Sequence, residues 1–505
     1  MRRAWVELGL VSGVLVGACV DLQPFQCIDD EDCRAGSVQG WCEDARYCSY
    51  PDAECPSGRR YSDLAGPLAS VCTGVGGSES SSGSSTSMDT SAGSTTAEGS
   101  SDSTAESSGS GNPTCGNGVV EPGEECDELD AVDGDGCNTD CWASGSVRWS
   151  AVVASDGGGD DRLFGLTQLA SGDVVSVGYF QAETRDVLIS RWSVGTVEDG
   201  QVTPGQESGR VVYDVDGGSD AAEAVVLAAL GEVFVCGTAN VAGTSRSWVG
   251  RWDAALPPDP IFQAPLPAVA SGGCFDIAYV SSSNVTAVGG NSTVAWAHRF
   301  TSTDATGGDQ AEVMGASETR FRSAVRAPDG DLFVAGQVGD LATVYEPVSA
   351  TDLGPAVVQT ANAIQPQSMR VTSDAIVLGG LLRDGGSFDE LWVAAFELDG
   401  TPRWEYTPAQ PGLAADEVED IALDPAGNVY AIGHVTRNND NPDRWVAKLD
   451  PEGTLVWERH DYEGSDVGID RGRSIEVLPD GDLLVVAEIT STEGDLDGWI
   501  ARLAP

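Results

Sequence analysis

Three aspartates lie close together in a glycine-rich segment, and their carboxylates are the groups best placed in this sequence to bind a metal ion. Asp127, Asp133 and Asp135 occur within CDELDAVDGDGC, and Ca²⁺ prefers clustered oxygen ligands. The spacing is not that of an EF-hand, because Cys137 interrupts the loop and no glutamate closes it. A solvated turn therefore explains these residues better than a Ca²⁺ site, which stays as the second interpretation.

The remaining polar residues do not form a catalytic pattern. The three histidines, His298, His434 and His460, fall in separate segments without a repeated acidic neighbour. This spacing supports neither a metal cluster nor a Ser-His-Asp arrangement. The glycine-rich segments lack the lysine and the following helix of a phosphate-binding loop. We therefore predict no catalytic residues and no cofactor, and we expect that the protein is not an enzyme.

Cysteine usage indicates an oxidising compartment. Thirteen cysteines are present, and setting Cys19 aside leaves three groups with even numbers that can pair internally. The spacings are not those of a structural zinc site, and no histidine lies near the first two groups. The twelve predicted disulfide cysteines are Cys27, Cys33, Cys42, Cys48, Cys55 and Cys72, then Cys115, Cys126, Cys137 and Cys141, and finally Cys236 and Cys274.

The N-terminus has the features of an export signal. Arg2 and Arg3 precede the apolar stretch VELGLVSGVLVGA, which is too short to span a bilayer. The stretch ends in VGAC and resembles a bacterial lipobox, which implies that residues 1–18 are removed and that Cys19 is lipidated. An ordinary cleaved signal is the alternative. Val20 follows Cys19, and by analogy with known lipoprotein sorting this favours the outer membrane.

Two cysteine-rich modules flank a linker. Residues 19–72 comprise the lipidated N-terminus and a module of six cysteines from Cys27 to Cys72, which predicts three disulfides in one of fifteen connectivities. Residues 73–114 consist almost entirely of Ser, Gly, Thr and acidic residues, which predicts a disordered linker. Residues 115–142, with the motifs CGNGVVEPGEECD and DGDGCNTDC, resemble the myxobacterial cysteine-rich repeat, except that Glu128 stands where a second Asp is usual. This resemblance implies a surface lipoprotein.

Residues 143–505 contain a repeat of β-strands. A turn glycine is followed by an apolar run that ends in a small residue in ASGDVVSVG, ALGEVFVCG, PDGDLFVAG, PAGNVYAIG and PDGDLLVVA, and looser copies end at Gly289 and Gly379. Each unit reads as four antiparallel strands, and a third strand often carries Trp. Seven units of about 50 residues predict an all-β fold, a seven-bladed β-propeller. A β-helix or a pair of sandwiches is the structural alternative.

Two long-range contacts follow from this arrangement. The last unit lacks a fourth strand, and residues 145–153 match the fourth-strand copies, with Trp149 aligned to Trp404 and Trp457. We therefore expect residues 145–153 to complete the seventh blade, since closure removes exposed sheet edges. Cys236 ends a second strand and Cys274 begins the next unit, so we predict a disulfide across that blade junction.

The first strands should line a central channel. At equivalent positions before the turn glycine they carry small residues with one acid, namely Gly165, Ala224, Ser323, Asp420 and Ser474. Close packing explains small residues there without any ligand. Asp420 and its neighbour Glu419 are the only residues that suggest a binding site in the channel.

The charge of the chain limits its partners. The sequence has 79 acidic and 27 basic residues, a net charge of −52, which makes nucleic acid an improbable partner. Lysine is almost absent, with Lys448 alone, and we interpret this scarcity as compositional bias. We expect a lipoprotein anchored to the membrane and facing the cell surface or the periplasm. Its non-catalytic propeller would bind a protein, a glycan or another partner in the cell envelope. The alternative is a quinoprotein-like or hydrolytic propeller enzyme, which the scattered arginines disfavour.

Overall fold

The structure is a computed structural model, and its second half is described nearly in full. The chain divides into two compact units, Met1–Ser108 and Gly109–Pro505. In the first unit the described residues are 34–35, 38–39, 41–42, 48–51, 55 and 59–61. In the second they are residues 115–505, except for 118–119, 121–123, 128–131, 156–157, 182, 199–200, 216, 229–230, 242, 267–271, 306–307, 316–317, 384–388, 409–415, 437–441, 461–467 and 492–493. The predicted signal peptide 1–18, the lipidated Cys19, the linker 73–114 and Cys27, Cys33 and Cys72 lie outside the described residues.

Short strands make up the described part of the first unit. β1 (Arg34–Ala35) pairs with β2 (Val38–Gln39), and β3 (Trp41–Cys42), β4 (Cys48–Pro51) and β5 (Arg59–Tyr61) form a second antiparallel sheet. Cys55 is buried and disulfide-bonded. The guanidinium of Arg59 lies 5.1 Å from the ring centre of Trp41.

Every regular element described in the second unit is a β-strand, and every strand pairing is antiparallel. This confirms the predicted all-β class. Among the described residues there is no helix with the length and hydropathy needed to cross a membrane.

Four sheets of the second unit have four strands each, paired in a simple antiparallel order. The first contains β7 (Arg162–Gln168), β8 (Val174–Gln181), β9 (Arg185–Trp192) and β12 (Glu207–Tyr213), and a separate hairpin of β10 (Thr196–Glu198) and β11 (Gln201–Thr203) lies between β9 and β12 in the sequence. The second contains β13 (Ala221–Leu227), β14 (Glu232–Val241), β15 (Thr244–Asp253) and β16 (Phe262–Pro265). The third contains β28 (Glu417–Leu423), β29 (Val429–Thr436), β30 (Pro442–Leu449) and β31 (Leu455–His460). The fourth contains β32 (Arg471–Val477), β33 (Leu483–Thr490), β34 (Leu496–Leu503) and β6 (Val147–Val153).

The strands between the second and third of these sheets are joined into one eleven-stranded sheet. Its strands are β17 (Gly273–Ser281), β18 (Asn284–Gly290), β19 (Val294–Thr301), β20 (Asp309–Met314), β21 (Arg320–Arg326), β22 (Leu332–Val338), β23 (Leu341–Tyr345), β24 (Ala356–Val371), β25 (Ala375–Arg383), β26 (Glu390–Glu397) and β27 (Pro402–Tyr406). The link between β18 and β21 is the single pair Gly290 and Arg320. The sixteen-residue β24 pairs with β23 through its first part and with β25 through its last part.

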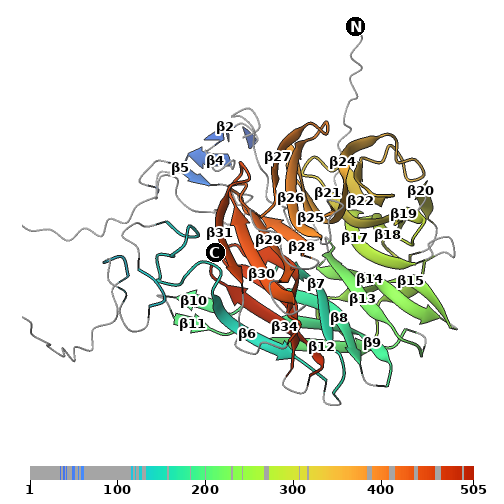
Figure 1. The fold of residues 1–505 in the computed structure, drawn as a ribbon, viewed down its shortest axis with the longest axis horizontal. Coiled ribbons are helices and arrows are strands. Elements are labelled where there is room, and N and C mark those ends of the chain that lie inside the picture. The colour runs from blue at the N-terminus through green and yellow to red at the C-terminus, as the bar shows by residue number, and fades with distance from the viewer. Residues whose placement is uncertain are drawn as a thin grey trace, which may run out of the picture. The chain divides into compact units, whose positions relative to one another are not determined.

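Seven strands of the second unit contact one another in a closed series. β7 contacts β13, and the series continues through β17, β21, β24, β28 and β32, which contacts β7 again. In Figure 1 the colour of this unit accordingly runs round from teal β6–β12 through green and yellow to red β34, beside teal β6. We call these seven strands the inner strands.

Residues ahead of the first inner strand pair with the last strand of the chain. β6 is hydrogen-bonded to β34, from Val147 opposite Leu503 to Val153 opposite Gly498. Trp149 on β6 is only 5% exposed, and its indole N–H donates to the carbonyl of Val194 at 3.0 Å. The pairing that the sequence predicts for residues 145–153 is therefore present.

A β-bulge occurs at the same place in every inner strand, and it explains the repeated glycine. The bulged backbone approaches the end of the neighbouring strand so closely that a Cβ on Gly433 would lie 1.9 Å from the carbonyl oxygen of Glu417. Equivalent contacts, all within 2.2 Å, exist at Gly178, Gly237, Gly289, Gly336 and Gly380. The looser copy in the fifth unit thus ends at Gly380 rather than at Gly379. Gly380 pairs with Pro366, which precedes the bulge, whereas Gly379 pairs with Ser368, which follows it.

The seventh inner strand differs from the other six. There Ala487 stands where the other repeats have glycine, and it pairs with Gly472. In the other six strands the partner of the glycine carries a side chain. A Cβ on Gly472 would instead lie 2.2 Å from a side-chain carbon of Ile432 on β29.

The predicted disulfide between Cys236 on β14 and Cys274 on β17 is confirmed. Both cysteines are fully buried in a hydrophobic cluster that joins the two sheets. The tryptophans predicted on third strands are buried in the same way, and Trp248, Trp252, Trp296, Trp392 and Trp445 are among the largest side chains with under 2% exposure.

Truncation of Trp149 tests the importance of the β6–β34 pairing. We expect Trp149→Ala to lower the free energy of unfolding by about 3–5 kcal/mol, since it leaves a large cavity in a buried cluster. Val152→Ala is the matched control, because Val152 lies on the same strand and is 54% exposed. Chemical denaturation followed by tryptophan fluorescence measures both variants, and equal loss in the two would contradict the proposed role of Trp149.

Candidate functional site

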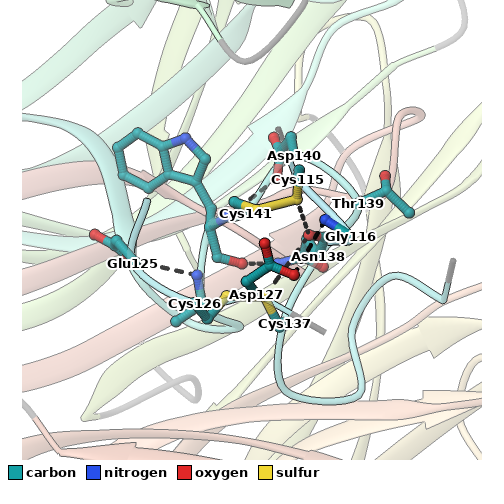
Figure 2. The surroundings of a disulfide bond; sticks show 12 residues. Cys115, Gly116, Glu125, Cys126, Asp127, Cys137, Asn138, Thr139, Asp140 and Cys141 are labelled. Atoms are coloured by element: carbon teal, nitrogen blue, oxygen red, sulfur yellow. Dashed lines mark hydrogen bonds between the residues drawn. A yellow bond between two sulfur atoms is a disulfide. The ribbon is translucent and has the colours of Figure 1, made fainter. Parts of the chain in front are cut away.

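Two disulfides hold the four-cysteine module together. Cys115 pairs with Cys141, and Cys126 pairs with Cys137, a connectivity that the sequence leaves open. Figure 2 shows both bridges close together around Asn138. The Asn138 carboxamide oxygen accepts a hydrogen bond from the N–H of Gly134 at 2.7 Å, and its amide donates to the carbonyl of Trp142 at 2.8 Å. Asn138 thus fixes the turn that connects the two bridges.

The three aspartates considered for Ca²⁺ do not converge in this module. The Asp127 carboxylate accepts from the N–H of Gly116 (Figure 2), and that of Asp133 accepts from the N–H of Thr139. Asp127 instead lies with Glu124 and Cys141, whose potential ligand atoms are within 4.8 Å of one another. The sulfur of Cys141 is committed to a disulfide, so it offers no thiolate to a metal.

The module is attached to the strands through buried ionic contacts. Gly109–Pro505 is one compact unit, although the sequence analysis separates 115–142 from 143–505. The ammonium of Lys448 donates to the carbonyl of Gly134 at 2.8 Å and lies 5.3 Å from the ring centre of Tyr430. Lys448 is 7% exposed. The only lysine of the chain therefore has a specific structural contact.

Arg148 makes a second attachment. Its guanidinium lies 2.6 Å from the carboxylate of Asp140 in the module and 2.9 Å from that of Asp482 on the strand side. Asp482 also accepts from Arg502, which is 1% exposed. This chain of alternating charges leaves the buried guanidinium groups compensated.

A cavity of ≈ 250 Å³ lies among the inner strands, and residues of all seven line it. The bulge adds one residue to each inner strand, and that residue lines the cavity in every case. These seven bulge residues are Phe164, Glu223, Phe275, Arg322, Gln367, Glu419 and Arg473. Among them, the sequence analysis singled out only Glu419.

Asp420, the residue after one of these bulges, binds neighbouring strands. One carboxylate oxygen accepts from the hydroxyl of Ser368 at 2.6 Å, and the other accepts from the hydroxyl of Ser474 at 2.8 Å and the N–H of Ile475. Asp420 therefore connects β28 to both adjacent inner strands. Hydrogen bonds of this kind to a carboxylate stabilise its charged form, and they occupy oxygens that a ligand would need.

Asp276 has the same role elsewhere in the unit. Its carboxylate accepts from the hydroxyl of Ser323 at 3.1 Å and from the N–H of Ala324 at 2.8 Å, which connects β17 to β21. Burial raises its pKa to about 6, and the hydrogen bonds oppose that shift. The small residues predicted on inner strands thus include serines that donate to these two aspartates.

Glu419 takes part in a buried ion-pair network. Arg473 donates to Glu419 at 2.7 Å and to Glu488 at 2.9 Å, and Glu488 is fully buried. Burial disfavours the charge on Arg473, but these two carboxylates outweigh it and raise the Arg473 pKa. Both sequence-predicted residues, Glu419 and Asp420, line the cavity, and both already have partners in the protein.

A cluster missed by the sequence analysis combines Glu417, Glu419 and His434, whose potential ligand atoms lie within 4.8 Å of one another. Glu417 and His434 are opposite each other on β28 and β29, a proximity that only the strand register reveals. Burial and the neighbouring Glu419 carboxylate raise the pKa of Glu417 to about 7. Two carboxylates and an imidazole are suitable divalent-metal ligands, but Arg473 already pairs with the Glu419 oxygen that faces His434.

Comparison with known proteins does not identify a family for this chain. No family model matches it, and no curated protein matches it. Sqt1 from Chaetomium thermophilum is 13% identical over 69% of this chain and 97% of its own, with a TM-score of 0.42. A protein of unknown function from Dyadobacter fermentans is 11% identical over 71% of this chain and 99% of its own, also with a TM-score of 0.42. Structural similarities this remote give no information about the function of this chain.

The contact of Lys448 with the cysteine module leads to a second prediction. Lys448→Met keeps the length of the side chain but removes its donor to Gly134, so residues 132–142 should lose protection against amide hydrogen exchange. The strands β13–β16 should keep theirs and act as the internal reference. Hydrogen exchange with mass spectrometry measures both, and unchanged protection of the module would show that Lys448 does not hold it.

The acidity of Glu476 leads to a third prediction. Burial raises its pKa from 4.5 to about 7, Arg370 opposes this shift and Asp420 adds to it. The folded state therefore binds the proton more tightly than the unfolded state, and the stability that this group contributes is lost as the pH rises from about 4.5 to about 7. Glu476→Gln should therefore be more stable than the wild type at pH 8.

The expected gain is on the order of 1–3 kcal/mol at pH 8, because one pKa unit corresponds to about 1.4 kcal/mol. At pH 4.5 the two proteins should be equally stable. Glu452→Gln, at an exposed position, is the control. Denaturant unfolding across this pH range measures the free energy of unfolding of both proteins. A difference between variant and wild type that did not grow with pH would refute the role of Glu476.

Proposed function

We propose that the second unit is a closed, seven-bladed β-propeller. The cyclic contacts of the inner strands, including that of β32 with β7, support this proposal. A further support is the hydrophobic cluster in which Leu484 and Ile500 of the last sheet pack with Val174 and Leu188 of the first. On this interpretation each inner strand begins a blade, and β6 supplies the fourth strand of the last one.

We propose further that the chain is an exported lipoprotein that acts as a non-catalytic binding or scaffolding protein in the cell envelope. The VGAC sequence supports lipidation of Cys19, and the disulfides support an oxidising compartment. The partner class is a protein, a glycan or another envelope component. The docked cysteine module would then be part of the rigid domain, with the linker 73–114 between it and the membrane.

One observation carries the binding function: the cavity between the inner strands is lined by charged side chains of both signs. Channels of propellers are concave sites at which several strands converge, and such concave sites are where ligands are usually bound. Most of the polar groups in this cavity are engaged in holding inner strands together, as Asp420 and Asp276 are. No histidine is among the described residues that line the cavity, so its serines have no imidazole base there.

A quinoprotein-like enzyme is the second candidate. Its cofactor would need a pocket of at least the usual 300–1,000 Å³, whereas the cavity measures ≈ 250 Å³. An absorbance spectrum and a metal analysis of the protein purified from its native membrane separate the two functions. We expect no quinone absorbance, and a stoichiometric bound quinone would overturn the proposal.

The anchor gives a fourth prediction. Cys19→Ser should move the protein from the membrane fraction to the soluble fraction, because acyl chains supply the attachment. Cys55→Ser controls for loss of a cysteine as such, since Cys55 is a disulfide cysteine. Cell fractionation and immunoblotting measure both, and full retention of Cys19→Ser in the membrane would refute lipidation.

A further inference from the structure

Most charged groups that line the cavity make a hydrogen bond or an ion pair with another described residue, and Arg322, Glu223 and Glu476 do not. Glu476 interacts electrostatically with Arg370. Arg473 pairs with Glu419 and Glu488, and Arg370 pairs with Asp420 at 3.2 Å. Within the described part of the chain, neither Arg322 nor Glu223 makes a hydrogen bond or an ion pair through its side chain. Both are bulge residues that line the cavity.

The guanidinium of Arg322 is positioned by an aromatic ring. Its Cζ lies 4.3 Å from the ring centre of Phe275, close enough for a cation–π contact. Its Nε is buried without a hydrogen-bond partner among the described residues. Burial lowers the pKa of Arg322, and the nearby Arg320 adds to this effect, while Glu417, Glu419 and Glu223 oppose it. Arg322 therefore presents a charged group, with donors to spare, in the cavity.

Glu223 lies on the other side of Phe275 in the order of the inner strands, since β17 comes between β13 and β21. Burial raises its pKa, and the positive charges of Arg322 and Arg473 oppose that shift. Glu223 and Arg322 thus influence each other electrostatically without touching. In the order of the inner strands, Phe275 thus stands between a residue with an unpaired carboxylate and one with an unpaired guanidinium.

Both side chains are partly buried, and charged groups that lose contact with water are stabilised by an opposite charge. A ligand with only a negative charge would leave the charge of Glu223 uncompensated. A ligand with only a positive charge would leave the charge of Arg322 uncompensated. We propose that this cavity binds a small zwitterion, whose carboxylate Arg322 binds and whose ammonium group Glu223 binds. This inference rests on the proposed function, in which the cavity is the binding site of the propeller.

The size and lining of the cavity fit such a ligand. A volume of ≈ 250 Å³ corresponds to about eight water molecules at roughly 30 Å³ each, which accommodates a single amino acid and excludes an oligomer. Arginine can bind a carboxylate through two parallel hydrogen bonds. Phe164 and Phe275 add apolar surface between the charged groups.

Matched probes test the inference by isothermal titration of the full chain. Glycine and 4-aminobutanoate are the zwitterions, butanoate lacks the ammonium group, and butylamine lacks the carboxylate. We expect at least one zwitterion to bind at least about tenfold more tightly than either singly charged probe. Equal binding of butanoate or of butylamine, or no binding of either zwitterion, would overturn the inference.

Two variants locate the site. Arg322→Gln and Glu223→Gln should each weaken zwitterion binding at least about tenfold, and Arg322→Gln should not affect butylamine. Arg326→Gln, at an exposed position of the same strand, should bind like the wild type. Loss of affinity in Arg326→Gln alone would place binding outside the cavity and overturn the inference.

Failure here is distinguishable from failure of the proposed function. If no zwitterion binds and the purified protein carries no quinone, the inference fails while the non-catalytic propeller stands. If a quinone is bound, the proposed function itself fails. Circular dichroism of both cavity variants shows whether a loss of binding reflects unfolding.

Discussion

The close approach between the bulged inner strand and its neighbour is the contact on which the rest of the second unit depends. A bulge places two residues opposite one and brings the backbones together, so that a Cβ at Gly178 would lie 1.8 Å from the carbonyl oxygen of Arg162. Glycine meets this requirement in six of the seven repeats, and the last repeat has Ala487 opposite Gly472. The repeated glycine of the sequence is therefore a backbone requirement that recurs for six of the seven inner strands.

The inner strands are also held together by carboxylates rather than by apolar packing alone. Asp276 and Asp420 each accept from a serine hydroxyl and a backbone N–H of the following inner strand. A buried carboxylate is stabilised only when its oxygens receive hydrogen bonds of this kind. The serines Ser323 and Ser474 that the sequence presents as small packing residues are the donors, so their hydroxyls matter as much as their size.

Much of the strand arrangement could be predicted from the sequence, because it depends on repeated local patterns. The β6–β34 pairing was predictable from the match of Trp149 to Trp404 and Trp457, and the Cys236–Cys274 bridge from two cysteines at corresponding strand ends. The candidate site was mostly not predictable. The repeated glycine lies on the neighbouring strand and does not identify the bulged residue, so Glu223 and Arg322 looked like ordinary strand residues. The proximity of Glu417 to His434 likewise depends on the strand register.

The bulge also explains why the cavity can carry function. The residues on either side of it, such as Val418 and Asp420, are fixed by backbone contact or by hydrogen bonds to the next strand. The bulge residue itself has no partner in the ladder, and across the seven inner strands it is aromatic, acidic, basic or amide. Its side chain is therefore the one position of each inner strand that the fold leaves undetermined. Glu419 and Arg473 form an ion pair at these positions, which stabilises the contact between neighbouring inner strands. The charges of Arg322 and Glu223 are available to a ligand.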